Sequence, residues 1–221
     1  MAAAALPAAD VLGVDVAVGT VESAAHAVIA RALSGEGGHA VLCNVHVLMT
    51  ARKHRELLAA LHRAWAVFPD GAPVAWMQRR LGCPEAERVG GPDLMPAVLD
   101  RGRERGLRHA FVGSTQDVLD RLVATMEGRY PGVEIVLALA PAPGAEDDPA
   151  TLAAVRAASP HVVWVALGAP KQELWMARTA AALTPALLVG VGAAFDFHAG
   201  TKARAPGWMQ QAGLEWLHRL A

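Results

Sequence analysis

The sequence predicts an α/β fold: a Rossmann-like open, mostly parallel sheet with helices on both faces. Short apolar or β-branched runs alternate along the chain with helical segments, which is typical of a parallel sheet. The runs are continuously apolar, which indicates strands buried on both sides. Polar residues and glycines follow the runs where the strands end. Ligands bind outside the carboxyl ends of such strands, so we expect a binding crevice there.

The strands are expected at the apolar runs, and the segments between them at helices and loops. The expected strands are residues 40–43, 65–68, 109–112, 133–140, 161–167 and 187–191. The segment 140–150, APAPGAEDDPA, is rich in proline and acidic residues and short enough for a strand-to-helix loop.

Four segments carry helix start signals, because a side-chain oxygen stands where the first backbone N–H groups need an acceptor. Thr20 precedes VESAAHAVIARAL, Asp93 precedes LMPAVLDRGRER and Ser114 precedes TQDVLDRLVATM. Asp148 is followed by Pro149, a residue favoured at the first helical position.

The last expected helix is amphipathic and spans about residues 206–220. Trp208, Ala212 and Trp216 recur at helical spacing and form an apolar stripe. We expect this stripe to pack against the domain. Contact with a second copy of the chain, as in a homo-oligomer, or with a membrane surface is the alternative.

Length and composition predict a single domain over residues 1–221 and exclude several classes. The chain is 53% hydrophobic and 19% charged, with a net charge of −1, so no overall positive field favours nucleic acid. Two cysteines are too few for a disulfide framework. The N-terminus lacks a basic signal region, and the uncharged stretch 179–195 is too short and too rich in Pro and Gly for a membrane span. We expect a cytoplasmic protein.

Asp70, in FPDGAP, is the leading candidate for catalysis. Pro69 and Gly71 flank this carboxylate at a strand end and could aim it into the crevice, where it would act as a general base toward a hydroxyl. The alternative is that Asp70 only caps the next helix. Asn44, in LCNVH, suits hydrogen bonds to sugar hydroxyls, although Asn is also common in turns.

Two further segments are typical of anion binding. ERVGGPDL combines Arg88 and Asp93 with two glycines, and GAPKQELW places Lys171, Gln172 and Glu173 in the first turn of a helix. A plain turn and a surface helix start are the alternatives. GVGAAFDFHAG holds a Gly-x-Gly ending at Gly192, but no third glycine completes a dinucleotide motif, which disfavours NAD.

Metal sites are weakly indicated. Cys43 with His46, and Asp196 with His198, are pairs without further ligands, and the chain contains no Asp-x-Asp motif. We therefore expect neither a metal nor an organic cofactor.

Five segments in this order, CNVHVLMTAR, FPDGAPVAW, ERVGGPDLM, GAPKQELWMA and GVGAAFDFHAGTKARAPGWMQQAGLEWLHRL, closely resemble the WecG/TagA/CpsF family of bacterial glycosyltransferases. The resemblance covers nearly the whole chain, and the last segment is the most specific. It implies an inverting enzyme that moves a sugar from a UDP donor to a polyprenyl-diphosphate-linked saccharide, at the inner face of the plasma membrane, in surface polysaccharide assembly. The sugar would be N-acetylmannosamine, its uronic acid or a hexose.

The resemblance also assigns site residues. Asp70 matches the proposed general base, and Asn44 matches the polar residue beside the reacting sugar. We expect substrate contacts, partly from the resemblance and partly from position at strand ends, from Asn44, Gly71, Arg88, Asp93, Gly113, Lys171, Gln172, Gly192, Asp196 and Arg204. Arg88 and Arg204 are the candidates to stabilise the departing diphosphate without a metal.

The sequence departs from the family pattern in two ways. Many members carry Thr two residues before the Asn, where this chain has Leu42, and members usually continue into a basic tail, where this chain stops at Ala221. Either the sequence is truncated, or closure over the nucleotide relies on Arg204, Arg219 or a neighbouring subunit in place of the tail. These departures keep a second hypothesis open, a UDP-sugar-binding scaffold without catalysis. A nucleotide-dependent oxidoreductase or methyltransferase is the third.

Overall fold

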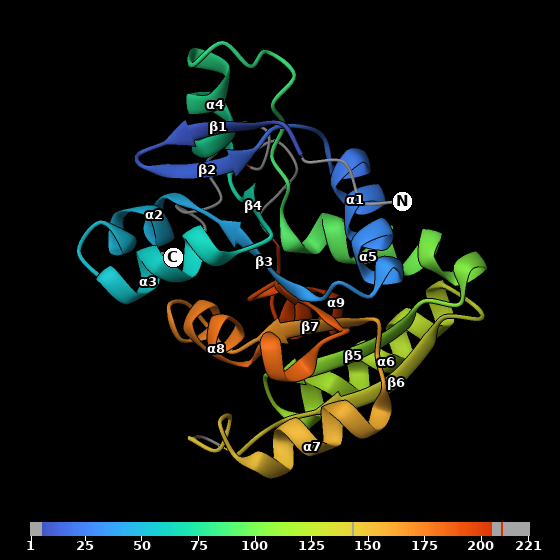
Figure 1. Ribbon diagram of the computed structural model, residues 1–221. Helices are drawn as coiled ribbons and strands as arrows, with labels where there is room; N and C mark the ends of the chain where they lie inside the picture. The colour runs from blue at the N-terminus through green and yellow to red at the C-terminus, as the bar shows by residue number, and fades with distance from the viewer. Residues whose placement is uncertain (1–5, 143, 205–208, 210–221) are drawn as a thin grey trace.

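The computed structural model describes residues 6–142, 144–204 and 209. Its centre is a six-stranded, all-parallel sheet in the order β4-β3-β8-β7-β5-β6 (Figure 1). The strands are β3 (Gly38–Cys43), β4 (Ala66–Pro69), β5 (Arg108–Gly113), β6 (Glu134–Leu139), β7 (Val162–Ala166) and β8 (Leu187–Gly190). All six expected strands are therefore confirmed, with ends that differ by at most two residues.

Helices cover both faces of the sheet (Figure 1), which confirms the α/β class. One layer contains α1 (Val21–Ser34), α5 (Gly91–Gly102), α6 (Gln116–Arg129) and α9 (Ala194–His198). The other contains α2 (Val45–Ala51), α3 (Arg55–Arg63), α4 (Ala72–Arg80), α7 (Pro149–Ala158) and α8 (Lys171–Thr179). In β7, Val162 and Trp164 join the first core, whereas Val163 and Val165 join the second. Both faces are thus buried, as the continuous apolar runs predict.

Two of the four predicted helix starts are confirmed. Thr20 forms a capping box with Ser23, and the side chain of Asp148 accepts a hydrogen bond from the N–H of Ala150. The 140–150 loop also lies where it is expected, between β6 and α7.

The other two predicted starts are wrong by a few residues. Helix α5 begins at Gly91 with Gly90 as its cap, because Pro92 suits the first turn, and Asp93 lies inside that turn. Helix α6 is capped by Thr115, whose Oγ1 accepts from the N–H of Val118 at 3.4 Å. Ser114 adopts a left-handed φ of 59° and directly follows β5.

An antiparallel hairpin, formed by β1 (Ala8–Val11) and β2 (Val14–Ala17), was not predicted from the sequence. Its two-residue turn places Leu12 and Gly13 at φ 58° and 85°, the pattern of a primed hairpin turn, in which Leu is unusual. Gln78 on α4 is fully buried and donates to the carbonyls of Val16 and Ala17 at 2.9 and 3.0 Å. These bonds attach the hairpin to α4, and β2 lies beside the edge strand β4 without joining the main sheet.

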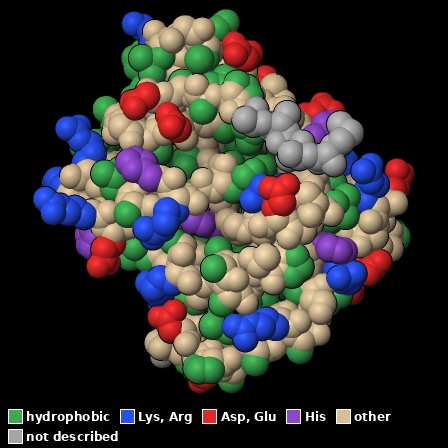
Figure 2. All heavy atoms as spheres, viewed as in Figure 1, with side chains coloured by type: hydrophobic (Ala, Val, Ile, Leu, Met, Phe, Trp, Pro, Cys, Tyr) green, Lys and Arg blue, Asp and Glu red, His purple; other side chains and the backbone are tan. Residues whose placement is uncertain are grey.

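Acidic and basic side chains are interspersed over the face shown in Figure 2. In the described part of the chain, no helix is both long and apolar enough to cross a membrane. The amphipathic helix expected at 206–220 lies outside the described residues, apart from Met209.

Candidate active site

A cleft of about 300 Å³ opens at the carboxyl ends of β4, β3 and β8. These three strands are neighbours in the sheet, so the residues that follow them meet at one edge although they are far apart in sequence. The cleft is lined by five predicted site residues, Asn44, Asp70, Arg88, Gln172 and Gly192. Its volume is at the lower end of the range for small-molecule sites.

Asp70 directly follows β4, and its N–H donates to the carbonyl of Cys43 at 3.0 Å, which holds the end of β4 against β3. Gly71, at φ 104°, is the N-cap of α4, and α4 has no side-chain cap. The alternative interpretation of Asp70 as a helix cap is therefore wrong. Its carboxylate lines the cleft instead.

Arg88 approaches Asp70 through backbone pairing of their segments. The N–H of Val89 donates to the carbonyl of Pro69 at 2.7 Å, so the loop before α5 runs along the end of β4. A Cβ on Gly90 would lie 2.9 Å from Arg88 Nη1 and 3.2 Å from Asp70 Oδ1. The guanidinium and the carboxylate thus converge over the backbone of Gly90, where a side chain would displace the arginine from its present position.

Asp93 holds the other side of this arginine. The guanidinium of Arg88 pairs with Asp93 Oδ2, and Arg204 binds both carboxylate oxygens of Asp93 at 2.8 Å. Neither Asp93 nor Arg204 lines the cleft. Asp93 therefore orients Arg88 from behind, and the guanidinium of Arg204 is directed at Asp93.

Asn44 begins α2, and its Oδ1 accepts from the N–H of Val47 at 3.0 Å. The alternative for Asn44 was a turn residue, and the structure makes it the N-cap of α2. The side chain also lines the cleft, so Nδ2 is its atom that can donate to a ligand. Leu42, where the family pattern has Thr, lines the cleft beside it.

Gln172 is buried in the first turn of α8 and connects that helix to β8. Its Oε1 accepts from the N–H of Gly192 at 3.1 Å, and its Nε2 donates to Oε1 of Glu173 at 3.0 Å. A Cβ on Gly190 would lie 2.5 Å from Nε2, so only glycine leaves room for this amide.

Glu173 also lines the cleft; the sequence placed it in the first turn of a helix with Lys171 and Gln172, but it was not among the expected substrate contacts. It is 1% exposed, and burial is the main cause that raises the pKa of its carboxyl. His46, at the start of α2, also lines the cleft and lowers that pKa in part. The sequence signal that indicates Glu173 as a cleft residue is an acidic residue in the first turn of a helix that follows a buried strand.

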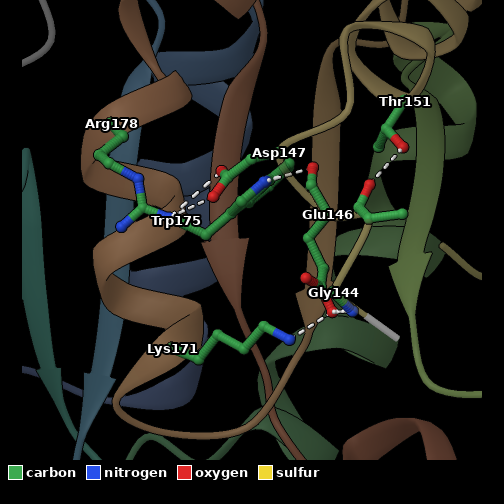
Figure 3. Close-up of polar contacts among 8 residues, drawn as sticks. Gly144, Glu146, Asp147, Thr151, Lys171, Trp175 and Arg178 are labelled. Carbon is green, nitrogen blue, oxygen red and sulfur yellow. Dashed lines mark hydrogen bonds and ion pairs between the residues drawn. The ribbon is translucent and has the colours of Figure 1, made fainter. Parts of the chain in front are cut away.

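The remaining predicted contacts do not line the cleft. Lys171 pairs with Glu146, and Figure 3 shows its side chain directed at the loop before α7. That hydrogen bond is the main cause that lowers the pKa of Glu146. The same loop is joined to α8 by Trp175 Nε1, which donates to the carbonyl of Glu146 at 2.9 Å, and by Arg178, which pairs with Asp147 (Figure 3).

Gly113 and Asp196 have structural environments of their own. A Cβ on Gly113 would lie 2.3 Å from the carbonyl oxygen of Ala166, so glycine permits β5 and β7 to approach. Asp196 pairs with Lys202 at 3.2 Å, and His198 Nε2 lies 3.0 Å from the carbonyl of Pro92. Among the described residues, no group of three or more His, Cys, Asp or Glu gathers as metal ligands do.

A carboxylate beside a guanidinium, in a crevice at the ends of parallel strands, is a site for activating a hydroxyl and stabilising an anionic leaving group. The profile of the glycosyl transferase WecG/TagA/CpsF family matches residues 9–221. The chain belongs to this family.

Two Bacillus proteins illustrate the similarity to other WecG/TagA/CpsF members. An N-acetylglucosaminyldiphosphoundecaprenol N-acetyl-beta-D-mannosaminyltransferase of Bacillus spizizenii (strain ATCC 23059 / NRRL B-14472 / W23) is 30% identical over 186 residues, 84% of this chain and 71% of the relative. The protein of the same name from Bacillus subtilis (strain 168) is 29% identical over 178 residues, 80% of this chain and 68% of the relative. The family expected from the motifs is thus confirmed.

Proposed function

We propose that this chain is an inverting, metal-independent glycosyltransferase that uses a UDP-sugar donor and a polyprenyl-diphosphate-linked saccharide acceptor. The observation that carries the proposal is the convergence of Asp70 and Arg88 on one cleft, which Asn44 and Gln172 also line. One side chain can remove a proton and the other can neutralise a phosphate, as this transfer requires.

In the proposed reaction, Asp70 takes the proton of an acceptor hydroxyl as the hydroxyl oxygen attacks the anomeric carbon of the donor sugar. The bond between that carbon and the phosphate oxygen breaks, and UDP leaves with the electron pair. Attack opposite the leaving group inverts the anomeric carbon. Arg88, oriented by Asp93, stabilises the charge on the diphosphate.

The names of the two relatives support N-acetylmannosamine as the transferred sugar and an N-acetylglucosaminyl diphosphate lipid as the acceptor. Its uronic acid and hexoses are the other sugars that the family resemblance implies. A lipid-linked acceptor resides in a membrane, so we place the working enzyme as a peripheral protein at the inner face of the plasma membrane.

A two-part experiment tests the proposal. Thermal shifts are measured with UDP, UDP-N-acetylmannosamine, UDP-glucose and NAD, each with magnesium and with a chelator, because a ligand of the native state raises Tm. Transfer is then measured onto a lipid-linked N-acetylglucosamine diphosphate. We expect UDP compounds to stabilise the protein equally well with the chelator, and UDP-N-acetylmannosamine to support transfer.

Other outcomes would redirect the proposal. Binding of UDP without transfer to any lipid acceptor would favour the scaffold hypothesis. Stabilisation by NAD but not by UDP would favour an oxidoreductase. Transfer that disappears with the chelator and returns with magnesium would contradict metal independence.

A further inference from the structure

One polar atom of the cleft has no hydrogen-bond partner among the residues that the structure describes. Oε2 of Glu173 is fully buried, and the residue as a whole is 1% exposed. A buried polar atom without a partner costs free energy, so such atoms are rare in native proteins and often mark a place that a ligand completes. Glu173 is one of the residues that line the cleft, so a ligand bound there lies beside its side chain.

The neighbouring hydrogen bonds determine what Oε2 can do. The N–H of Gly192 can only donate, so it requires the carbonyl oxygen of Gln172, and the Gln172 amide must then turn Nε2 toward Glu173. Nε2 can only donate in turn, so Oε1 of Glu173 is an acceptor. A proton on this carboxyl therefore belongs on Oε2.

The surroundings favour the protonated acid. No Lys or Arg forms an ion pair with Glu173 among the described residues, and burial raises the pKa of its carboxyl. A neutral acid also does not repel a diphosphate in the same cleft, whereas a carboxylate would.

Glu173 and Asp70 both lie near the end of β3. Burial is the main cause that raises the pKa of the Cys43 thiol. The carboxyl groups of Glu173 and Asp70 raise it further, so both lie near the same sulfur atom. Asn44 follows Cys43 and lines the same cleft as both acidic residues. A sugar ring bound beside Asn44 would thus lie near Asp70 and Glu173 together.

We propose that Glu173 is a sugar-recognition residue whose Oε2 donates a hydrogen bond to an oxygen of the donor sugar, a hydroxyl or the acetamido carbonyl. This inference rests on the proposed function and adds a specificity-determining residue to it. The hydrogen bonds from Gly192 to Gln172 and from Gln172 to Glu173 hold the acid in place. In this proposal the contact of Glu173 selects the sugar and not the nucleotide.

Equilibrium titrations with UDP and with UDP-N-acetylmannosamine test this proposal on the wild type, Glu173→Gln and Glu173→Met. Gln keeps one N–H donor toward the cleft and an oxygen for Gln172, whereas Met has a similar length and no donor. We expect the Kd of the UDP-sugar to rise roughly tenfold in Glu173→Met and to change less than about threefold in Glu173→Gln. The Kd of UDP should stay constant in both variants.

A second readout does not depend on the folding of Glu173→Met. Raising the pH should remove the proton from Glu173 and weaken UDP-sugar binding by the wild type more than by Glu173→Gln. Asp70, His46 and Arg88, which also line the cleft, and Cys43 beneath it are present in both proteins, so the difference between them isolates Glu173. Thr179→Val, a buried change on the same helix whose hydroxyl donates only to the carbonyl of Trp175, is the control for a general effect on α8.

The outcomes separate the two proposals. Equal UDP-sugar affinity in Glu173→Met and the wild type, or an equal loss in Glu173→Gln and Glu173→Met, would overturn the role of Glu173 while UDP binding upheld the proposed function. Parallel pH profiles of the wild type and Glu173→Gln would also overturn it. If the wild type bound no UDP compound, the proposed function itself would fail, and this inference with it.

Discussion

Asp93 and Arg204 form two parallel hydrogen bonds, Nη1 to Oδ1 and Nη2 to Oδ2, both 2.8 Å long, although 111 residues separate them. Asp93 pairs with Arg88 through the same carboxylate. One acidic residue in the first turn of α5 therefore joins a cleft arginine to the segment that precedes residue 205. This geometry makes Asp93 a positioning residue for Arg88.

Asp93→Asn should lower the free energy of unfolding by about 1 kcal/mol, because two partly exposed charge-assisted pairs are lost. Asp147→Asn, which breaks the exposed pair with Arg178, is the matched control, with an expected change below about 0.5 kcal/mol. Urea unfolding measures both. Equal changes in the two variants would show that the Asp93 pairs contribute no more than a surface ion pair.

Asp70→Asn should lower kcat roughly 10²–10⁴-fold, because the amide cannot take the acceptor proton. UDP affinity and Tm should change little, since the side chain keeps its size and the backbone bond to Cys43 remains. Transfer onto the lipid acceptor measures kcat, and thermal shift measures binding. A variant with near wild-type kcat would exclude Asp70 as the base.

Gly91→Ala should destabilise the fold by about 1–3 kcal/mol, because its Cβ would lie 2.7 Å from the carbonyl oxygen of Val191, a backbone atom that cannot turn away. Gly128→Ala, inside α6 with nothing within 4 Å of the new Cβ, is the control. Alanine there should stabilise by about 0.5–1 kcal/mol. Urea unfolding should give opposite signs, and two changes of one sign would contradict the close contact at Gly91.

His109 makes stability depend on pH. It is fully buried, and Trp164 Nε1 donates to its Nδ1 at 3.2 Å. Burial lowers its pKa from 6.5 to about 3, so below pH 6.5 the unfolded chain binds a proton that the folded chain does not. The contribution of neutral His109 to stability is therefore fully present above pH 6.5 and is lost as the pH falls.

Between pH 6.5 and 5.5, the wild type should lose about 1 kcal/mol more unfolding free energy than His109→Asn, whose oxygen can still accept from Trp164. His39 and His198, whose pKa values burial also lowers, remain in both proteins and cancel in the comparison. Urea unfolding at the two pH values measures this difference. Identical pH slopes would mean that His109 is as readily protonated in the native state as in the unfolded chain.

Glu173 has the opposite effect on the pH dependence of stability. Its native pKa lies above 4.5, so the folded state holds a proton that the unfolded chain releases, and stability falls as pH rises from 4.5 to the native pKa. Glu173→Gln should therefore gain stability over the wild type as pH rises, by up to about 1.4 kcal/mol per pH unit within that range. Unfolding titrations from pH 5 to 8 measure the gain. A stability difference that stays constant with pH would mean that the native carboxyl titrates at its ordinary pKa.

The strands and the edge of the sheet that holds the cleft could be predicted because they depend on local patterns. Apolar runs such as VVWVA in β7 are buried in any compact arrangement, and parallel strands place their carboxyl ends together. The polar residue after each run then belongs to the crevice, as with Asn44 and Asp70. The helix starts at Asp93 and Ser114 were misplaced because neighbouring Gly90 and Thr115 compete for the cap within a few residues.

The hairpin at residues 8–17 was missed because its strands are short and its turn carries Leu12 at positive φ, which propensity disfavours. Lys171, predicted as a ligand contact, pairs with Glu146, and nothing in the spacing of these two residues indicates that pair. Contacts of long side chains depend on how far separate elements approach, which a pattern along one segment does not contain.

The sequence by itself determined the fold class, the family and the main residues of the cleft, since strand burial, turn glycines and motif order are properties of the chain. Only the tertiary structure decided which motif residues face the cleft and which support it. Arg88 and Gln172 line it, whereas Asp93 lies behind Arg88 and pairs with Arg204. The order of strands β4, β3 and β8 decides which of these residues face the cleft, because it sets the spatial distances between segments that are far apart in the sequence.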